Sequence, residues 1–258
     1  MKIHPTAIVS KKAELARDVS VGPYTLIGDG VVIDDETMIG AHCVIEGRTK
    51  VGKRCQVLTG AVLGSIPQDL KYKGEMSFLE IGDENIIREY VTINLGTEEN
   101  SRTLVGNGNL IMAYSHIAHN CIIGNNCIIA NCGTLAGCVS IEDKAVVGGL
   151  VAIHQFSRVG SLSIIGGCSK VVSDVPPYST CDGHPARVYG LNLVGLRRQG
   201  ADGEVIKQLS HAFKILFNSG LTLHNALQKL NVEKNPSKEI SYLINFIKNS
   251  KRGVCRHR

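Results

Sequence analysis

Histidines, a glycine and a glutamine recur at a spacing that could assemble a general base and an oxyanion donor. His119, Gly137 and Gln155 follow one another at every eighteenth position, and His116 and His154 lie near the two ends of this series. An imidazole can take a proton from a hydroxyl near neutral pH, because its own pKa lies in that range. A glycine N–H can stabilise the negative charge that develops on an acyl oxygen. The pattern favours a general base with a nearby oxyanion donor if the fold stacks every eighteenth position.

Two other interpretations of the histidines are open at this point. The pair could simply decorate an exposed face, as surface histidines usually do. A His-x-x-His pair such as His116 and His119 can also bind zinc, but no third ligand stands at a convincing spacing. We therefore expect no metal ion and no cofactor here.

A period of six residues runs through most of the chain. Every sixth residue from Ile3 to Leu63 is aliphatic, and the same phase returns at Ile81 and, after a second break, from Val105 to Val171. A helix repeats its apolar face near every 3.6 residues, and a half-buried strand alternates every second residue, so neither explains this period. Three six-residue sides, or hexads, would close one triangular coil. We therefore predict an all-β solenoid, a left-handed parallel β-helix of hexapeptide repeats.

The predicted coil brings the candidate residues together. Successive coils lie about 4.8 Å apart, so His119, Gly137 and Gln155 form one column at a corner. His116 and His154 are next to inward-pointing isoleucines, so they should point outward. A second column has little side-chain bulk and could leave a groove; it contains Asn131, Gly149 and Gly167.

Four of the nine cysteines fall on the small inward position of their hexads. We interpret Cys43, Cys55, Cys121 and Cys127 as small buried hydrophobic residues rather than ligands.

The repeat is interrupted twice and ends near Val175. Residues 65–79 and 97–103 do not fit the period and should protrude as loops, which often carry function. The first loop contains Asp69 and Lys71. Beyond two prolines, apolar residues recur at helical spacing. We predict a β-helix over residues 1–190 and a small helical C-terminal domain over residues 191–258.

Composition argues against several classes of protein. The 258-residue chain has 43% hydrophobic residues and a formal net charge of +5, without the basic stripe of a nucleic-acid-binding protein. Its nine cysteines form no Cys-x-x-Cys pair, and no apolar run approaches a transmembrane length. We expect a cytoplasmic protein with reduced thiols and no nucleic-acid partner. The tail from Leu193 carries 12 basic and 4 acidic residues, which would suit an acidic partner.

Several motifs in this order resemble the UDP-N-acetylglucosamine O-acyltransferase family. They cover essentially the whole chain, and the histidine-containing runs are more specific than the hexapeptide repeat alone. The motifs are the repeats, Gln68-Asp69-Leu70-Lys71, His116-Ile117-Ala118-His119-Asn120-Cys121, Leu135-Ala136-Gly137, Ile153-His154-Gln155-Phe156, Val175-Pro176-Pro177-Tyr178, Gly190-Leu191-Asn192 and Gly195-Leu196-Arg197-Arg198.

The resemblance implies a homotrimer that catalyses the first step of lipid A biosynthesis in clefts between neighbouring subunits. A (3-hydroxy)acyl chain would pass from a thioester on acyl carrier protein to the 3-hydroxyl of UDP-N-acetylglucosamine. His119 would be the catalytic base, and the Gly137 N–H would stabilise the oxyanion. The remaining implied residues would bind substrate: Asp69, Lys71, His116, His154 and Gln155 at the sugar nucleotide, Asn192 and Arg198 near its phosphates, and Gly167 at the position that limits acyl-chain length.

The chain departs from the family pattern at four positions. Asn120 stands beside the base where some members have aspartate, and Val194 stands where an acidic residue is found. Cys138 and Pro185 replace histidines. These changes leave the base in place and bear on sugar recognition, so a 3-amino analogue of the sugar, which would give an amide, is an alternative acceptor.

Three further functions fit a hexapeptide solenoid. One is another hexapeptide acyltransferase, using acetyl-CoA or acting later in the same pathway. A second is a γ-type carbonic anhydrase, which requires three zinc-binding histidines. The third is a non-catalytic scaffold, in which His119 would have no role in any reaction.

Overall fold

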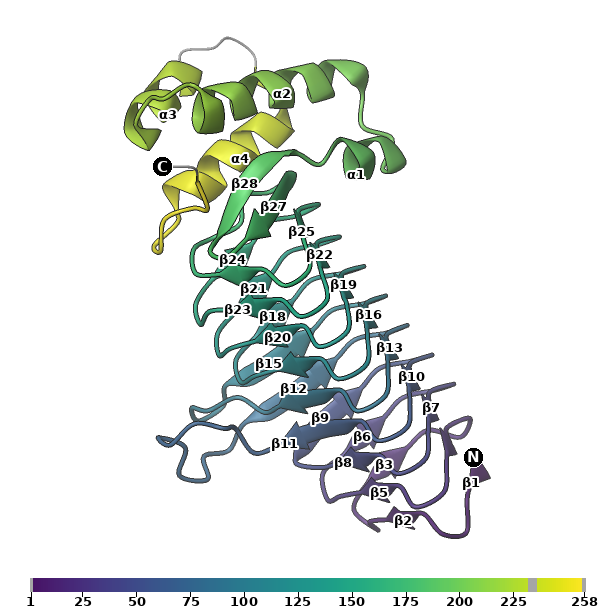
Figure 1. The fold of residues 1–258 in the computed structure, drawn as a ribbon. Helices are drawn as coiled ribbons and strands as arrows, with labels where there is room; N and C mark the ends of the chain where they lie inside the picture. The colour runs from purple at the N-terminus through teal and green to yellow at the C-terminus, as the bar shows by residue number, and fades with distance from the viewer. Residues whose placement is uncertain (1, 232–235, 257–258) are drawn as a thin grey trace.

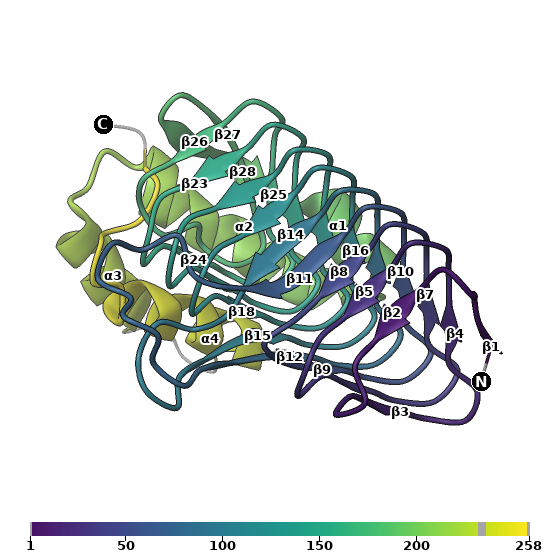
Figure 2. The same cartoon turned by 90° about the horizontal axis from the view of Figure 1, so that it is seen from below.

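In the part of the chain that the structure describes, short strands wind through three sheets toward a cap of four helices (Figure 1). The computed structural model describes residues 2–231 and 236–256. Through β26, successive strands enter sheets A, B and C in turn, so every third strand returns to the same sheet. The last two strands, β27 and β28, form an antiparallel hairpin at the end of sheet A. Seen from below, the coils stack one behind another toward the helices (Figure 2).

The strands of each sheet are very short, as a six-residue side requires. Sheet A contains β1 (Lys2–Ile3), β4 (Ser20–Val21), β7 (Met38–Ile39), β10 (Gln56–Val57), β13 (Ile86–Ile87), β16 (Leu110–Ile111), β19 (Ile128–Ile129), β22 (Val146–Val147), β25 (Ile164–Ile165), β27 (Ser179–Gly183) and β28 (Ala186–Leu191). Sheet B contains β2 (Ile8–Val9), β5 (Leu26–Ile27), β8 (Val44–Ile45), β11 (Val62–Ser65), β14 (Thr92–Asn94), β17 (His116–Ile117), β20 (Thr134–Leu135), β23 (Ala152–Ile153) and β26 (Lys170–Val171). Sheet C contains β3 (Glu14–Leu15), β6 (Val32–Ile33), β9 (Arg48–Val51), β12 (Phe78–Ile81), β15 (Arg102–Val105), β18 (Ile122–Ile123), β21 (Ser140–Ile141) and β24 (Arg158–Val159).

The strand register reproduces the predicted period. Partners in the regular part of the coil are three hexads apart, as in the pair Ile111 and Ile129. Val57 instead pairs with Ile87, and Ile87 pairs with Ile111, because the extra residues of two loops lie in between. The pairing therefore fits the β-helix that the sequence predicts.

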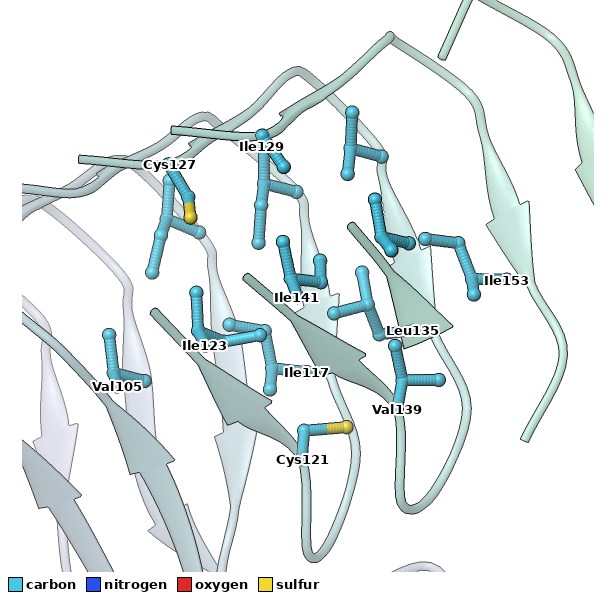
Figure 3. Packing of buried hydrophobic residues seen from close by; sticks show 14 of the residues in the cluster. Val105, Ile117, Cys121, Ile123, Cys127, Ile129, Leu135, Val139, Ile141 and Ile153 are labelled. Carbon is cyan, nitrogen blue, oxygen red and sulfur yellow. The ribbon is translucent and has the colours of Figure 1, made fainter. Parts of the chain in front are cut away.

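The interior is a column of stacked aliphatic side chains with a few thiols (Figure 3). Ile117, Ile123 and Ile129 lie on three successive sides of one coil and are almost fully buried. The four cysteines predicted to point inward are also buried, which confirms that interpretation. Burial raises the pKa of Cys121 to about 12, so its thiol is neutral at pH 7.

The β18 strand offers a matched test of this core. Ile123 is 2% exposed, whereas its neighbour Ile122 points outward and is 49% exposed. We expect Ile123→Ala to lower the free energy of unfolding by about 2–5 kcal/mol, because it removes buried methyl groups and leaves a cavity. Ile122→Ala should cost less than about 1 kcal/mol. Denaturant titration at one fixed protein concentration would compare them, and equal losses would contradict the inward assignment.

The position of a residue on the coil can be described by the corner at which it lies. Corner A–B follows strands of sheet A, corner B–C follows strands of sheet B, and corner C–A follows strands of sheet C. Asn120 and Cys138, both at corner B–C, adopt left-handed backbone angles with φ of 58° and 60°. This geometry turns the chain tightly at each corner.

Two longer connections leave the coil. One joins β11 to β12 and projects from the side of the solenoid (Figure 1), and the other joins β14 to β15. They contact each other, because the Asn100 N–H donates to the Met76 carbonyl at 2.7 Å and Glu99 accepts the Met76 N–H at 2.9 Å.

The helices are α1 (Leu193–Arg198), α2 (Gly203–Asn218), α3 (Leu223–Asn231) and α4 (Lys238–Lys248). Polar contacts attach α4 to the last coils: the Tyr242 hydroxyl donates to Glu142, and the Arg158 guanidinium lies 4.1 Å from the centre of the Phe246 ring. Within residues 2–231 and 236–256, no helix has the length and apolar character needed to cross a membrane.

Candidate active site

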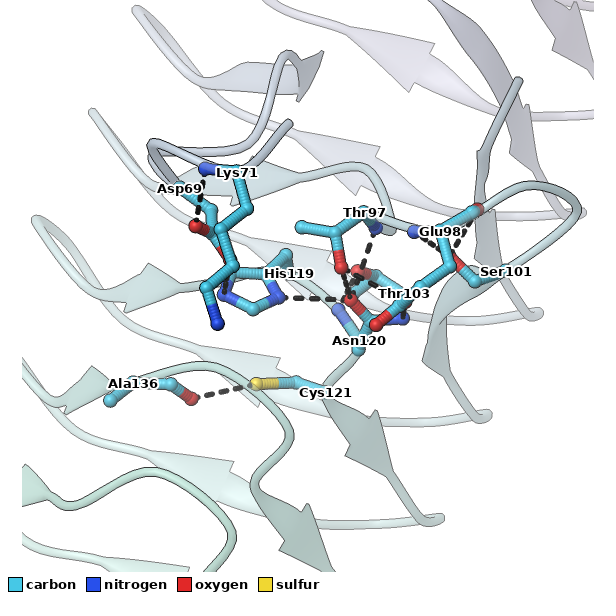
Figure 4. Close-up of polar contacts among 10 residues, drawn as sticks. All are labelled: Asp69, Lys71, Thr97, Glu98, Ser101, Thr103, His119, Asn120, Cys121 and Ala136. Carbon is cyan, nitrogen blue, oxygen red and sulfur yellow. Dashed lines mark hydrogen bonds and ion pairs between the residues drawn. The ribbon is translucent and has the colours of Figure 1, made fainter. Parts of the chain in front are cut away.

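His119 lies at corner B–C, between β17 and β18, with its imidazole between two polar side chains (Figure 4). Its Nε2 is 3.9 Å from Oδ2 of Asp69, and its Nδ1 is 2.9 Å from Oδ1 of Asn120. The side chain is 18% exposed, so the ring is held by neighbours but still open to a substrate.

The hydrogen bonds of Asn120 fix which nitrogen of His119 carries the proton. Oδ1 of Asn120 also accepts the Thr97 N–H at 3.1 Å, and it lies 2.8 Å from the Thr97 hydroxyl. A carboxamide oxygen can only accept, so Nδ1 of His119 must be the donor in their 2.9 Å contact. The lone pair of the neutral imidazole is therefore on Nε2, where it can accept a substrate proton.

The predicted column is present in the backbone. The Cys138 N–H donates to the His119 carbonyl at 2.9 Å, and the Phe156 N–H donates to the Gly137 carbonyl at 3.1 Å. These bonds join equivalent corners of successive coils. His119, Gly137 and Gln155 therefore stack, as their spacing of three hexads predicted.

Gly137 lies directly against the imidazole of His119. A Cβ atom at this position would overlap with Cε1 and Nε2 of the ring, so the packing requires glycine. In the part of the chain that the structure describes, the Gly137 N–H has no hydrogen-bond acceptor. The Gly149 N–H at another corner is in the same situation, so the proximity of His119 distinguishes Gly137.

Asp69 reaches His119 from the connection between β11 and β12. A local turn shapes this segment, in which Oδ1 of Asp69 accepts the Lys71 N–H at 2.9 Å. The amide of buried Asn94 donates to the Ile66 carbonyl at 3.1 Å and anchors the start of the loop. Lys71 is exposed, so its ammonium is available to a ligand.

His116, His154 and Gln155 lie on sheet B or at its corner. His116 is partly buried, with Nδ1 2.7 Å from the Thr92 hydroxyl, and burial lowers its pKa, which leaves it neutral at pH 7. His154 is exposed, and its Nδ1 is 3.1 Å from the Gln155 carbonyl. Both histidines thus point outward, as expected.

Three predicted site residues lie at other corners of the same chain. Gly167 is at corner A–B, between β25 and β26. Asn192 and Arg198 line a hollow of about 500 Å³ at corner C–A, together with Lys144 and Leu162. One chain by itself therefore does not bring these residues to His119.

Asn192 also has a structural role. Its side chain accepts the Gly195 N–H at 2.9 Å as the N-cap of α1, and its amide donates to the Leu162 carbonyl at 2.8 Å. This capping fixes the start of α1 and thereby the position of Arg198 at its end.

Thr97 and Glu98, which lie behind Asn120, were not predicted as site residues. The sequence marked Asn120 only as a departure from a family pattern and gave these two neighbours no role. The Glu98 carboxylate accepts the Asn120 amide at 3.0 Å. The signal that could have identified them is the break in the six-residue period at residues 97–103.

Across residues 2–231 and 236–256, no group of three histidine, cysteine or acidic side chains could hold a metal ion.

The stacked six-residue sides and the imidazole at a corner define a transferase of the hexapeptide-repeat class. Residues 102–137 match a family profile described as bacterial transferase hexapeptide, six repeats. Residues 174–255 match the profile for domain 2 of UDP-N-acetylglucosamine O-acyltransferase.

Full-length relatives specify the family. Proteins named acyl-[acyl-carrier-protein]–UDP-N-acetylglucosamine O-acyltransferase include one from Thiobacillus denitrificans, 44% identical over 98% of this chain and 99% of its own. One from Sulfurovum is 49% identical over 98% of this chain and 96% of its own. The solved UDP-N-acetylglucosamine acyltransferase of Campylobacter jejuni superposes with a TM-score of 0.92 at 38% identity and covers 100% of both chains. The chain belongs to the UDP-N-acetylglucosamine O-acyltransferase family.

Proposed function

We propose that this protein transfers a (3-hydroxy)acyl chain from acyl carrier protein to the 3-position of UDP-N-acetylglucosamine, the first step of lipid A biosynthesis. The observation that carries the proposal is the imidazole of His119, with its free Nε2, packed directly against Gly137, whose N–H has no acceptor among the described residues. The names of full-length relatives supply the substrates.

The proposed reaction uses His119 first as a base and then as an acid. Nε2 takes the proton of the sugar 3-hydroxyl while the oxygen attacks the thioester carbonyl carbon. The Gly137 N–H stabilises the oxyanion of the tetrahedral intermediate. As the intermediate collapses, the carbon–sulfur bond breaks and the imidazolium returns its proton to the departing thiol. A thioester is already activated, so the proposal includes no metal ion or cofactor.

The surrounding residues receive substrate-binding roles in this proposal. Asp69, next to His119, would hold the sugar nucleotide together with Lys71, His116, His154 and Gln155. Arg198 offers a guanidinium to the phosphates, with Asn192 beside it. Gly167 would leave room for a long acyl chain.

A threefold assembly would unite residues that one chain keeps apart. Suppose that the outer surface of sheet A in one subunit packs on the outer surface of sheet B in the next. Corner A–B of every subunit then points to the threefold axis. The outer corner C–A of one subunit then meets corner B–C of its neighbour. Arg198 of one chain would thus approach His119 of another, which supports a homotrimer with sites between subunits.

The surface of the chain agrees with such packing. Exposed Tyr90, Tyr114 and Leu150 lie along corner A–B, with Cys132 at the coil between Tyr114 and Leu150. The rings of Tyr90 and Tyr114 stack with centroids 5.2 Å apart. Sheet C carries an exposed Arg102–Glu80 ion pair, which suits a face in contact with water, while a part-exposed Arg88–Glu89 pair precedes Tyr90 at corner A–B.

The trimer can be tested at corner A–B. Leu150 is 63% exposed in the single chain. We expect Leu150→Glu to lower the trimer fraction strongly, because three carboxylates would meet in an apolar contact at the axis. Light scattering after size exclusion would measure the mass. The control is Ile122→Glu on sheet C, which should remain trimeric; a trimeric Leu150→Glu protein would contradict this packing.

The activity can be tested with purified protein. We expect acylated sugar nucleotide, detected by mass spectrometry, after incubation with UDP-N-acetylglucosamine and acyl carrier proteins bearing 3-hydroxyacyl chains of different lengths. A parallel series with the 3-amino sugar would reveal amide formation, the alternative acceptor chemistry. If no chain length gives product with either acceptor, the proposed function is wrong.

The handedness of the coil, the domain boundary and the cellular location complete the proposal. We infer that the coil is left-handed, that the described part of residues 1–190 forms the solenoid, and that the described part of residues 191–258 forms the helical domain; residues 1, 232–235 and 257–258 lie outside the described residues. Acyl carrier protein is acidic, so the basic tail would favour its docking. Because acyl carrier protein is the acyl donor in this proposal, the reaction would take place in the cytoplasm.

A further inference from the structure

Glu98 lies behind the candidate base and contacts it through Asn120 (Figure 4). Its Oε2 accepts the Asn120 amide at 3.0 Å and is 2.9 Å from the Thr97 hydroxyl. Ser101 holds this segment in place, because its Oγ accepts the Glu98 N–H at 2.9 Å and donates to the Glu98 carbonyl at 2.7 Å. A chain of hydrogen bonds therefore runs from Glu98 through Asn120 to Nδ1 of His119.

These hydrogen bonds restrain the orientation of the Asn120 amide, which would otherwise be ambiguous beside a histidine base. The two ends of a carboxamide are almost the same size, so the group can turn over within its site. In the turned orientation, Nδ2 of Asn120 would donate to Nδ1 of His119. The imidazole would then carry its proton on Nε2 and could not accept one from a substrate.

Glu98 opposes the turned orientation because a carboxylate only accepts hydrogen bonds. Hydrogen bonding from Thr97 lowers the pKa of Glu98, so the group is ionised at neutral pH. If Asn120 turned over, its oxygen would face this carboxylate. The Thr97 N–H would lose its acceptor at the same time, so the loop restrains both ends of the amide.

We propose that Glu98 is a positioning residue for catalysis, which holds the Asn120 amide so that Nε2 of His119 stays free to act as the base. This inference rests on the proposed role of His119. The connection between β14 and β15 would then have a function in catalysis, because this loop supplies both Thr97 and Glu98, which restrain Asn120.

The test removes Glu98 in two backgrounds. With Asn120 present, we expect Glu98→Ala to lower kcat roughly tenfold or more, about the effect of losing one hydrogen bond to a charged group, with little change in KM for the sugar nucleotide. Glu98→Gln should lose less, because its carbonyl can still accept the Asn120 amide. With Asn120→Asp, Glu98→Ala should cause no loss, because an aspartate has no donor to turn toward His119 and is relieved of a nearby like charge.

Glu99→Ala is the matched control for loop integrity. Glu99 is the next residue, and its carboxylate braces the same loop through the Met76 N–H without touching Asn120. It should keep kcat near the wild-type value. Glu98→Ala could lower kcat equally with Asn120 and with Asn120→Asp, or Glu99→Ala could lower kcat as much as Glu98→Ala. Either result would show that Glu98 only maintains the structure of the loop.

A readout independent of turnover separates this inference from the proposed function. In ¹⁵N-histidine-labelled protein, His119→Ala identifies the His119 signals, and their shifts report which nitrogen is protonated. We expect the Nδ1–H form in the wild type and a larger Nε2–H fraction in Glu98→Ala. An unchanged tautomer would overturn the role of Glu98, whereas wild-type protein without transfer activity would overturn the proposed function.

Discussion

His119→Ala should lower kcat for acyl transfer by about 10²–10⁴-fold, the range typical of losing a general base. The reason is that a sugar hydroxyl is a weak nucleophile at neutral pH, and the free Nε2 beside Asp69 is the group placed to accept its proton. The fold should be unaffected, because the imidazole lies at a corner outside the aliphatic column. Steady-state kinetics with saturating acyl carrier protein would measure the loss.

The matched control is His224→Ala. His224 is exposed on α3 and its ring contacts Gln228 at 3.0 Å, so the substitution changes the same residue type outside the proposed site. It should retain wild-type kcat. Should His119→Ala retain activity within a factor of a few, His119 could not be the base, and the scaffold interpretation of the histidines would regain support.

Gly137→Ala should also lower kcat strongly, by roughly 100-fold, because it displaces the base. The added methyl group would occupy the space of Cε1 and Nε2 of His119, so the ring must move by a substantial part of an ångström or more. Displacements of this size at a reacting group commonly cost about two orders of magnitude in rate. The backbone N–H at position 137 remains, so the experiment tests the position of the base rather than the oxyanion donor.

Gly203→Ala controls for the change from glycine to alanine. Gly203 begins α2, and a Cβ atom there would meet nothing within 4 Å. We expect wild-type kcat for this variant. A Gly137→Ala enzyme that keeps full kcat would show that the imidazole can shift freely, which is incompatible with the close packing on which the mechanism depends.

The residues behind His119 explain a departure from the family pattern. An asparagine beside the base would allow two orientations, and the contacts of Asn120 with Thr97 and Glu98 leave one of them satisfied. The carboxylate nearest to this position, that of Glu98, contacts the amide of Asn120 rather than the imidazole. In the proposed mechanism, this arrangement would keep His119 in its productive tautomer without a charge in contact with Nδ1.

The register of the coil follows from the order of residues alone. Each side has six residues and pairs with the next coil through backbone hydrogen bonds. A buried aliphatic residue such as Ile117 therefore determines which of its neighbours point inward and which point outward. The same periodicity placed His119 above Gly137 and Gln155, and pointed His116 away from the interior. Repeated local interactions propagate from coil to coil, so these features could be predicted from the repeat.

What approaches the histidine from outside the repeat depends on long-range packing. Asp69 and Glu98 belong to segments without period, and their paths depend on contacts between the two loops, such as the hydrogen bond from the Asn100 N–H to the Met76 carbonyl. The position of Arg198 depends on how α1 packs against corner C–A. No repeating backbone pattern specifies such contacts, so their geometry emerges only when the whole chain has folded.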